Sequence, residues 1–245
     1  MNNQTIEKLR SMRLVAMAQL HMQHVEQNTL QGMTCDEYLA LLADHQWEAR
    51  ENSKIDRLLS QAAFRQNASL ADINYTAQRN LDKNMFARLG TLDFLSRKEN
   101  LILCGACGTG KSYLSQALGH QACMSGIRTL YAVTARLFKK LKLGKVDGTY
   151  LKELEKLAKT ELLILDDFGL QAFDTQDRET LMDIIDDRHG KKSTIISSQI
   201  PVSAWYEIIG GEGTIADAIL DRIVNSSHRI DLKGESMRKG ILKHE

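Results

Sequence analysis

The residues Gly105, Gly110, Lys111 and Ser112 fit the spacing G-x-x-x-x-G-K-[ST] in full. Glycines let such a loop bend so that successive backbone N–H groups surround phosphate oxygens. The motif follows an apolar run at 101–104 and precedes a segment with helical spacing, so a helix N-terminus would face the same anion. Lys111 would add positive charge at the β- and γ-phosphates, and Ser112 would bind Mg²⁺. We therefore predict a nucleoside triphosphate site made by Gly105, Ala106, Cys107, Gly108, Thr109, Gly110, Lys111 and Ser112.

Two adjacent carboxylates, Asp166 and Asp167, end the apolar run of the segment ELLILDDFG. A strand of this kind presents its last residues at the carboxyl end of a parallel sheet, beside a phosphate-binding loop. We expect Asp166 to hold the Mg²⁺ shell through water, and Asp167 to orient or activate the attacking water. Either carboxylate alone would more often be a simple strand-end or helix-cap acid, and their position after the phosphate loop favours the functional interpretation.

Three further polar residues follow predicted elements late in the chain. Gln199 comes directly after the run STIISS, where its amide would hydrogen-bond the γ-phosphate or the attacking water. Arg222 lies near the end of an amphipathic segment, and Arg238 lies just beyond the last apolar run. Arginine is always charged and its fork of donors matches phosphate oxygens, whereas a surface salt bridge is the ordinary role of an isolated arginine.

The segments that must position these residues are of two kinds, short apolar runs and stretches with helical spacing, and the two kinds alternate along the chain. Short apolar runs separated by segments with helical spacing predict a parallel sheet covered on both faces. We thus expect an α/β fold of the P-loop class with a five-stranded parallel sheet, whose strands lie at 101–104, 128–133, 161–166, 193–198 and 228–232.

The residues before 101 have helical patterns and no β-rich segment. Thr34 and Glu37 have capping-box spacing, and Leu39, Leu42 and Trp47 follow near helical intervals. We expect two parts, residues 1–80 as an all-helical N-terminal region and residues 81–245 as the nucleotide-binding domain.

The composition excludes several classes of protein. The chain has 245 residues, of which 43% are hydrophobic and 26% charged, with a net charge of +1. It contains no apolar run of the roughly 18 residues that span a membrane, and its N-terminus has no secretory signal pattern. We expect a cytoplasmic protein without membrane association. Basic residues are nevertheless concentrated between Arg136 and Lys159.

The sequence resembles the AAA+ ATPases in the order of four features. These are the phosphate loop, the Asp166–Asp167 pair, Gln199 after an apolar run, and the late arginines Arg222 and Arg238. The segments LLILDDFGL, SSQIPVSAWYEIIG, ADAILDRIV and HRIDLKGESMRK are similar to those of the IstB family, the ATP-binding helper proteins of insertion-sequence transposition. This family is related to the DnaC-type helicase loaders. The resemblance extends over most of the chain, including LRSMRLVAMAQL near the start and WEARENSKIDRLL in the helical region.

The resemblance implies a Mg²⁺-dependent ATPase that forms a homo-oligomer, binds duplex DNA and communicates with a partner transposase. ATP would lie between neighbouring subunits, with Arg222 at the arginine-finger position and Arg238 at the second sensor position. The N-terminal region, to about Asn80, would serve partner and assembly contacts. Two features depart from the AAA+ pattern: Asp167 stands where most members have Glu, and the sequence ends soon after Arg238, so we expect no full helical lid.

In such an oligomer a basic patch repeats at each subunit, so weak phosphate contacts would add along a duplex. We predict that the DNA contacts include Lys139, Lys140, Lys142 and Lys145, which grip backbone phosphates without reading bases. An ordinary protein would carry the same lysines as a solvated face. The alternatives to a transposition helper are a DnaC-like helicase loader, a small-molecule kinase, and an architectural DNA binder in which ATP is structural.

Overall fold

The computed structural model describes residues 2–27, 32–76, 78–211 and 213–237. The chain divides into two compact units, Met1–Arg57 and Leu58–Glu245. The boundary that we expect after residue 80 lies inside the larger unit. Leu58 and Ala62, near the end of α3 (Cys35–Ala62), are buried in this unit with Cys123.

The smaller unit is helical. It contains α1 (Asn2–Ser11), α2 (Val15–Gln27) and most of α3 (Cys35–Ala62). The capping box predicted before α3 forms, because Glu37 accepts from the Thr34 backbone N–H at 2.8 Å and Thr34 Oγ1 accepts from the Glu37 N–H. Of the three apolar residues at helical intervals, Leu42 is buried, whereas Leu39 and Trp47 are 62% and 66% exposed.

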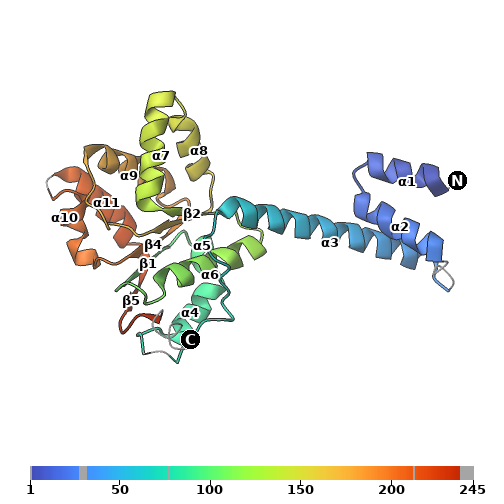
Figure 1. The fold of residues 1–245 in the computed structure, drawn as a ribbon, viewed down its shortest axis with the longest axis horizontal. Coiled ribbons are helices and arrows are strands. Elements are labelled where there is room, and N and C mark those ends of the chain that lie inside the picture. The colour runs from blue at the N-terminus through green and yellow to red at the C-terminus, as the bar shows by residue number, and fades with distance from the viewer. Residues whose placement is uncertain (1, 28–31, 77, 212, 238–245) are drawn as a thin grey trace, which may run out of the picture. The chain divides into compact units, whose positions relative to one another are not determined.

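A five-stranded parallel sheet forms the centre of the larger unit (Figure 1). Its spatial order is β2-β3-β4-β1-β5, with each neighbouring pair parallel. The predicted α/β class and the number of strands are confirmed, with strand bounds within two residues of those expected. The strands are β1 (Asn100–Gly105), β2 (Thr129–Val133), β3 (Leu162–Asp166), β4 (Ser193–Ser198) and β5 (Ser227–Leu232).

Helices cover both faces of the sheet. On one face, α4 (Lys83–Gly90), α5 (Asp93–Ser96) and α6 (Lys111–Met124) contribute to one hydrophobic core. The core on the other face includes residues of α7 (Thr134–Asp147), α8 (Tyr150–Ala158), α9 (Thr175–Arg188), α10 (Trp205–Ile209) and α11 (Thr214–Val224). A short 3₁₀ turn, η1 (Val202–Ala204), precedes α10.

Strand β1 shows why apolar runs without alternation fit this position. Leu101 and Leu103 belong to the core beside α6, and Ile102 and Cys104 belong to the core on the opposite face. Successive side chains of a strand point to opposite faces, so a strand covered on both faces must be apolar throughout. The strand ends then meet at one edge of the sheet, which is where the polar residues follow.

The described residues after β5 run to Met237 and contain no α-helix. Their backbone instead contacts two earlier loops, since the Lys233 N–H donates to the Arg79 carbonyl at 3.0 Å and the Met237 N–H donates to the Gly108 carbonyl at 2.9 Å. No helix in the described ranges is both long and apolar enough to cross a lipid bilayer.

Candidate nucleotide site

The glycine-rich loop connects the end of β1 to the start of α6. Gly105, the last residue of β1, has φ +151°, and a Cβ added there would collide with the Leu232 carbonyl oxygen of the neighbouring strand. Gly110 precedes α6 with φ +95° and provides no side-chain cap for its first N–H groups. The loop therefore keeps backbone donors at a helix N-terminus available for an anion.

Lys111 lies with its side chain against this loop. Its Nζ donates to the carbonyl oxygens of Gly105 at 2.7 Å and Ala106 at 2.8 Å. Burial lowers the pKa of Lys111, and the nearby acidic groups, including Asp166 and Asp167, act in the opposite direction. The loop itself thus holds an ammonium group where phosphate oxygens would need it.

Asp166, the last residue of β3, is 2% exposed and its carboxylate accepts from three hydroxyls. Ser112 donates to Oδ1 at 3.0 Å, Ser197 also donates to Oδ1, and Tyr131 donates to Oδ2 at 2.6 Å. These partners come from α6, β4 and β2, so the carboxylate lies where three elements meet. Ser112 and Asp166, expected to serve the same metal ion, are directly hydrogen-bonded.

Tyr131 was not identified from the sequence. Burial is the main cause that raises the pKa of Tyr131, and its hydrogen bond to Asp166 raises the pKa further. The phenol therefore stays protonated and acts as a donor. Strand β2 pairs with β3 so that Tyr131 lies opposite Ile164 and Val133 lies opposite Asp166. A polar residue inside the apolar run RTLYAV was the available signal, but the strand order was needed to use it.

Asp167 follows with φ +53°, a left-handed conformation that is uncommon for residues other than glycine. Such a conformation costs free energy and occurs often at functional sites. A cavity of about 650 Å³ brings two of the predicted catalytic residues, Asp167 and Gln199, together with part of the phosphate loop. The predicted residues that line it are Cys107, Gly108, Gly110, Lys111, Ser112, Asp166, Asp167 and Gln199.

Arg79 lines the same cavity and was also missed, because nothing distinguishes a single arginine in an irregular segment. It is 5% exposed, and its Nη atoms donate to the carbonyls of Thr109 at 3.1 Å and Asn74 at 2.9 Å. Its Nε has no hydrogen-bond partner among the described residues. Arg79 therefore connects the segment before α4 to the phosphate loop, and burial lowers its pKa.

The predicted arginines do not join this cavity within the described part of the chain. Arg222, in the last turn of α11, donates from Nη1 to the Ala218 carbonyl at 3.1 Å, and its Nε lies 3.1 Å from Asp186 Oδ1. Arg238 lies outside the described residues, directly after Met237, which does line the cavity.

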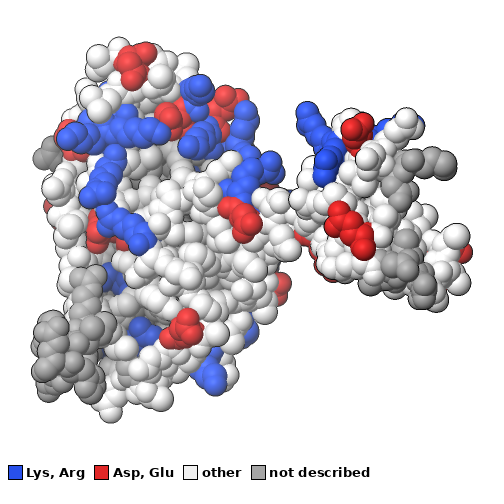
Figure 2. Space-filling model, turned by 45° about the vertical axis from the view of Figure 1, so that its right-hand side comes forward, with Lys and Arg blue, Asp and Glu red and all other residues white. Residues whose placement is uncertain are grey.

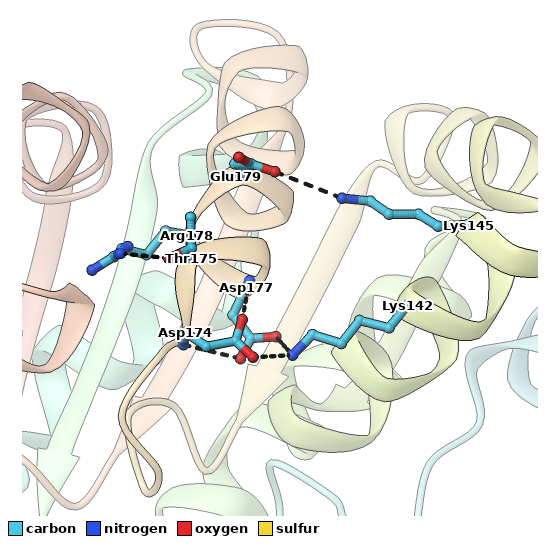
Figure 3. Close-up of polar contacts among 7 residues, drawn as sticks. All are labelled: Lys142, Lys145, Asp174, Thr175, Asp177, Arg178 and Glu179. Atoms are coloured by element: carbon cyan, nitrogen blue, oxygen red, sulfur yellow. Dashed lines mark hydrogen bonds and ion pairs between the residues drawn. The ribbon is translucent and has the colours of Figure 1, made fainter.

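The predicted DNA-binding lysines lie on α7, in the region where basic side chains gather among acidic ones in Figure 2. Lys140 Nζ lies 2.7 Å from Glu153 Oε2. Lys142 Nζ lies 2.7 Å from Asp174 and 2.8 Å from Asp177, and Lys145 lies 3.9 Å from Glu179 (Figure 3). Of the four lysines, only Lys139 has no such partner among the residues that the structure describes.

Comparison with known proteins places this site in a family context. The family model described as IstB-like ATP binding protein matches residues 7–244. An insertion-sequence ATP-binding protein of Sinorhizobium fredii, y4pL, is 43% identical over 235 residues, covering 96% of each chain. The insertion sequence IS1162 ATP-binding protein of Pseudomonas fluorescens is 37% identical over 204 residues, covering 83% of this chain and 88% of that one.

Solved structures share the fold. The crystal structure of DnaI has a TM-score of 0.58 at 23% identity and covers 68% of this chain and 92% of that chain. DnaA from Aquifex aeolicus, bound to AMPPCP, has a TM-score of 0.57 at 18% identity and covers 74% of this chain and 55% of that chain. The P-loop fold of the AAA+ type that we expected from the sequence is thereby confirmed.

Proposed function

The chain belongs to the IstB-like ATP-binding protein family, and we propose that it hydrolyses ATP and acts as a helper of a transposase. In this role the chain itself would assemble as a homo-oligomer on duplex DNA. The observation that carries the proposal is the hydrogen bond between Ser112 and Asp166 beside the ammonium group of Lys111. This arrangement combines a phosphate loop with a hydroxyl–carboxylate pair. The names of the relatives supply the link to insertion sequences.

The donor set at the loop fits Mg²⁺. This ion prefers oxygen ligands and retains several waters, so it needs few protein ligands when phosphates are present. Ser112 Oγ and the carboxylate of Asp166 lie 3.0 Å apart, and no dedicated cluster of His, Cys, Asp and Glu ligands lies among the described residues. Ser112 would bind the ion directly and Asp166 through water. When bound, Mg²⁺ would neutralise charge on the β- and γ-phosphates.

The chain's own residues divide the remaining work of hydrolysis. The backbone N–H groups of the loop and Lys111 would hold the phosphates. Asp167, beside Asp166 and in the same cavity, would accept a hydrogen bond from the attacking water and orient it. Gln199 follows β4 and lines this cavity, so its amide would donate to a γ-phosphate oxygen or to that water.

The site would be completed between subunits. Arg222 lies outside the cavity of its own chain and would act on the nucleotide of a neighbour. Arg238, which lies outside the described residues, would serve as the second sensor of the nucleotide; it follows Met237, whose backbone N–H donates to the Gly108 carbonyl of the phosphate loop. Residues 1–80 would serve contacts with the transposase and between subunits.

Sedimentation of the full chain with ATP, with duplex DNA and with both tests this function. We expect assembly that depends on nucleotide or DNA, and ATPase activity per subunit that rises with protein concentration. A monomer under all these conditions would contradict the proposal. The second candidate is a helicase loader, favoured by the structural likeness to DnaI and to DnaC, the latter with a TM-score of 0.54. Retention of a replicative helicase, and not of a transposase, would support that candidate.

A further inference from the structure

Arg79 carries a buried donor that the proposed hydrolysis does not use. Its side chain is 5% exposed and lines the nucleotide cavity. Nη1 and Nη2 donate to the carbonyls of Thr109 and Asn74, whereas Nε has no partner in the described part of the chain. A buried donor without an acceptor costs free energy, and a ligand that supplies the acceptor removes this cost. The unpartnered Nε therefore points to a ligand atom that accepts a hydrogen bond.

The position of Arg79 is fixed from two sides. Its carbonyl accepts from the Lys233 N–H at 3.0 Å, and Nδ2 of the next residue, Asn80, donates to the Asp231 carbonyl at 3.1 Å. On the other side, a Cβ added at Gly110 would lie 2.5 Å from Arg79 Nη1, so the guanidinium lies against the backbone of the phosphate loop. The unpartnered nitrogen is thus held in place before a ligand binds.

The order of the strands decides which part of a nucleotide Arg79 can reach. Strand β1, which leads into the phosphate loop, lies between β4 and β5 (Figure 1). Asp166, the carboxylate expected at Mg²⁺, ends β3, which lies beyond β4. Arg79 lies on the opposite side of β1, beside the residues that follow β5. Because the γ-phosphate would lie with the metal ion, the nucleoside would extend from the loop toward Arg79.

The cavity beside Arg79 also has apolar walls. Ile73 is 7% exposed and Met237 contributes a second apolar side chain. Ligand sites commonly combine apolar walls with a few fixed polar groups that determine specificity. A purine base matches this combination, since its flat faces pack against apolar side chains and its ring nitrogens accept hydrogen bonds. Ribose, which carries hydroxyl groups, matches the apolar walls less well.

We propose that Arg79 recognises the base of the bound nucleotide, and that its Nε donates a hydrogen bond to a ring nitrogen of the purine. This inference rests on the proposed function, since it requires that the cavity bind ATP. It extends that function from the phosphates to the base. A buried donor that is already fixed would remain unpaired with a base lacking the acceptor, and this is how a site rejects such a ligand.

The test uses ATP and three analogues, 1-deaza-ATP, 3-deaza-ATP and 7-deaza-ATP, each of which has C–H in place of one ring nitrogen. Binding in the presence of Mg²⁺ is measured by calorimetry on the full wild-type chain, on Arg79→Lys and on Arg65→Lys. Arg79→Lys keeps a positive charge and a donor for the loop but has no nitrogen at the position of Nε. Arg65→Lys is the matched control, because Arg65 lines the same cavity and is exposed.

We expect one of the three analogues to bind the wild-type chain roughly 10- to 100-fold more weakly than ATP, the equivalent of one hydrogen bond to a charged group. Arg79→Lys should bind ATP more weakly by a similar factor, and should bind ATP and that analogue alike. Arg65→Lys should discriminate between the two ligands as the wild-type chain does.

A role of Arg79 in supporting the loop alone would weaken the binding of ATP and of all three analogues to Arg79→Lys by one common factor. That result, with discrimination intact, would overturn the inference. Equal binding of ATP and all three analogues to the wild-type chain would overturn it without any variant, so the test does not depend on the folding of Arg79→Lys, which thermal unfolding verifies. A wild-type chain that binds none of these nucleotides would contradict the proposed function itself.

Discussion

Arg222 on α11 and Asp186 on α9 form an ion pair, with Nε and Oδ1 3.1 Å apart, outside the nucleotide cavity of their own subunit. The Asp186 side chain is 61% exposed, so the pair is a weak restraint and Arg222 can exchange it for a phosphate group. An arginine near the surface end of a helix is suited to reach a neighbouring subunit.

Arg222→Ala should therefore reduce ATP turnover, by roughly 10³- to 10⁵-fold if it acts as established arginine fingers do. Mixing Arg222→Ala with Lys111→Ala should restore part of the activity, because some mixed interfaces join an intact loop to an intact finger. Asp186→Asn is the control, since it removes the ion pair but keeps Arg222, and it should retain turnover. Mixtures as inactive as either variant alone would exclude a role in trans.

Lys111→Ala should weaken ATP binding about 10- to 100-fold, the equivalent of one hydrogen bond to a charged group. Binding of a fluorescent ATP analogue measures this directly. Cys107→Ser is a matched control in the same loop, because Cys107 is exposed and occupies a variable position of the motif. Equal weakening in both variants would mean that general disturbance of the loop, and not the lost charge, is responsible.

The pH dependence of ATP binding should also report on Lys111. Burial lowers the pKa of this ammonium group, so in the nucleotide-free chain it loses its proton at a lower pH than an ordinary lysine does. Since only the charged form attracts phosphate, affinity should be full at neutral pH and fall as pH rises through that lowered pKa. The residual affinity of Lys111→Ala should lack this alkaline fall. A fall of the same shape in the variant would assign it to another group.

The sheet could be predicted from sequence because a strand that is buried on both faces has a recognisable local pattern, an apolar run without alternation. The site could be predicted in part for the same reason, since Lys111, Asp166 and Gln199 follow strands or loops with recognisable patterns. The spatial order of the strands has no comparable local sequence pattern. This order is what brings Tyr131 and Ser197 to Asp166.

Long-range polar partners were equally hidden in the sequence. Lys142 belongs to a basic segment, and only the packing of α7 against α9 shows that two acids engage it. Arg79 lies in a segment without periodicity, so its bond to Thr109 could not be anticipated. A charge pattern gives the sign of a surface but not which of its charges are free.

Arg188, at the end of α9, is 2% exposed, and we expect its side chain to contribute strongly to the free energy of unfolding. It donates to Thr194 Oγ1 and to four backbone carbonyls, those of Leu157, Thr160, Glu161 and Ser193. Burial lowers its pKa to about 9, which still leaves it charged at neutral pH. This single side chain therefore joins the end of α8 to the starts of β3 and β4.

Arg188→Met should lower the free energy of unfolding by roughly 3–5 kcal/mol, because the apolar side chain leaves buried carbonyls without donors. Urea unfolding of the full chain measures the change. Lys191→Met, at an exposed position three residues later, should change the free energy by less than about 0.5 kcal/mol. A loss for Arg188→Met no larger than that of the control would contradict the role of Arg188 as a buried donor.

Asp167→Asn should leave ATP binding intact and lower turnover by about 10²- to 10⁴-fold, the usual contribution of a positioned acid or base. The amide cannot accept the proton of the attacking water, yet asparagine tolerates the left-handed conformation that Asp167 adopts at φ +53°.

Asp167→Ala separates the loss of the carboxylate from the strain of the backbone. It should lose turnover similarly and also lose stability, since alanine is strained at this φ. Asp167→Glu restores a carboxylate one methylene further out and should retain turnover. Single-turnover hydrolysis and analogue binding, measured on the same preparations, distinguish these outcomes. Hydrolysis by Asp167→Asn at the wild-type rate would assign the orientation of water to another group in the cavity, with Gln199 the first residue to substitute.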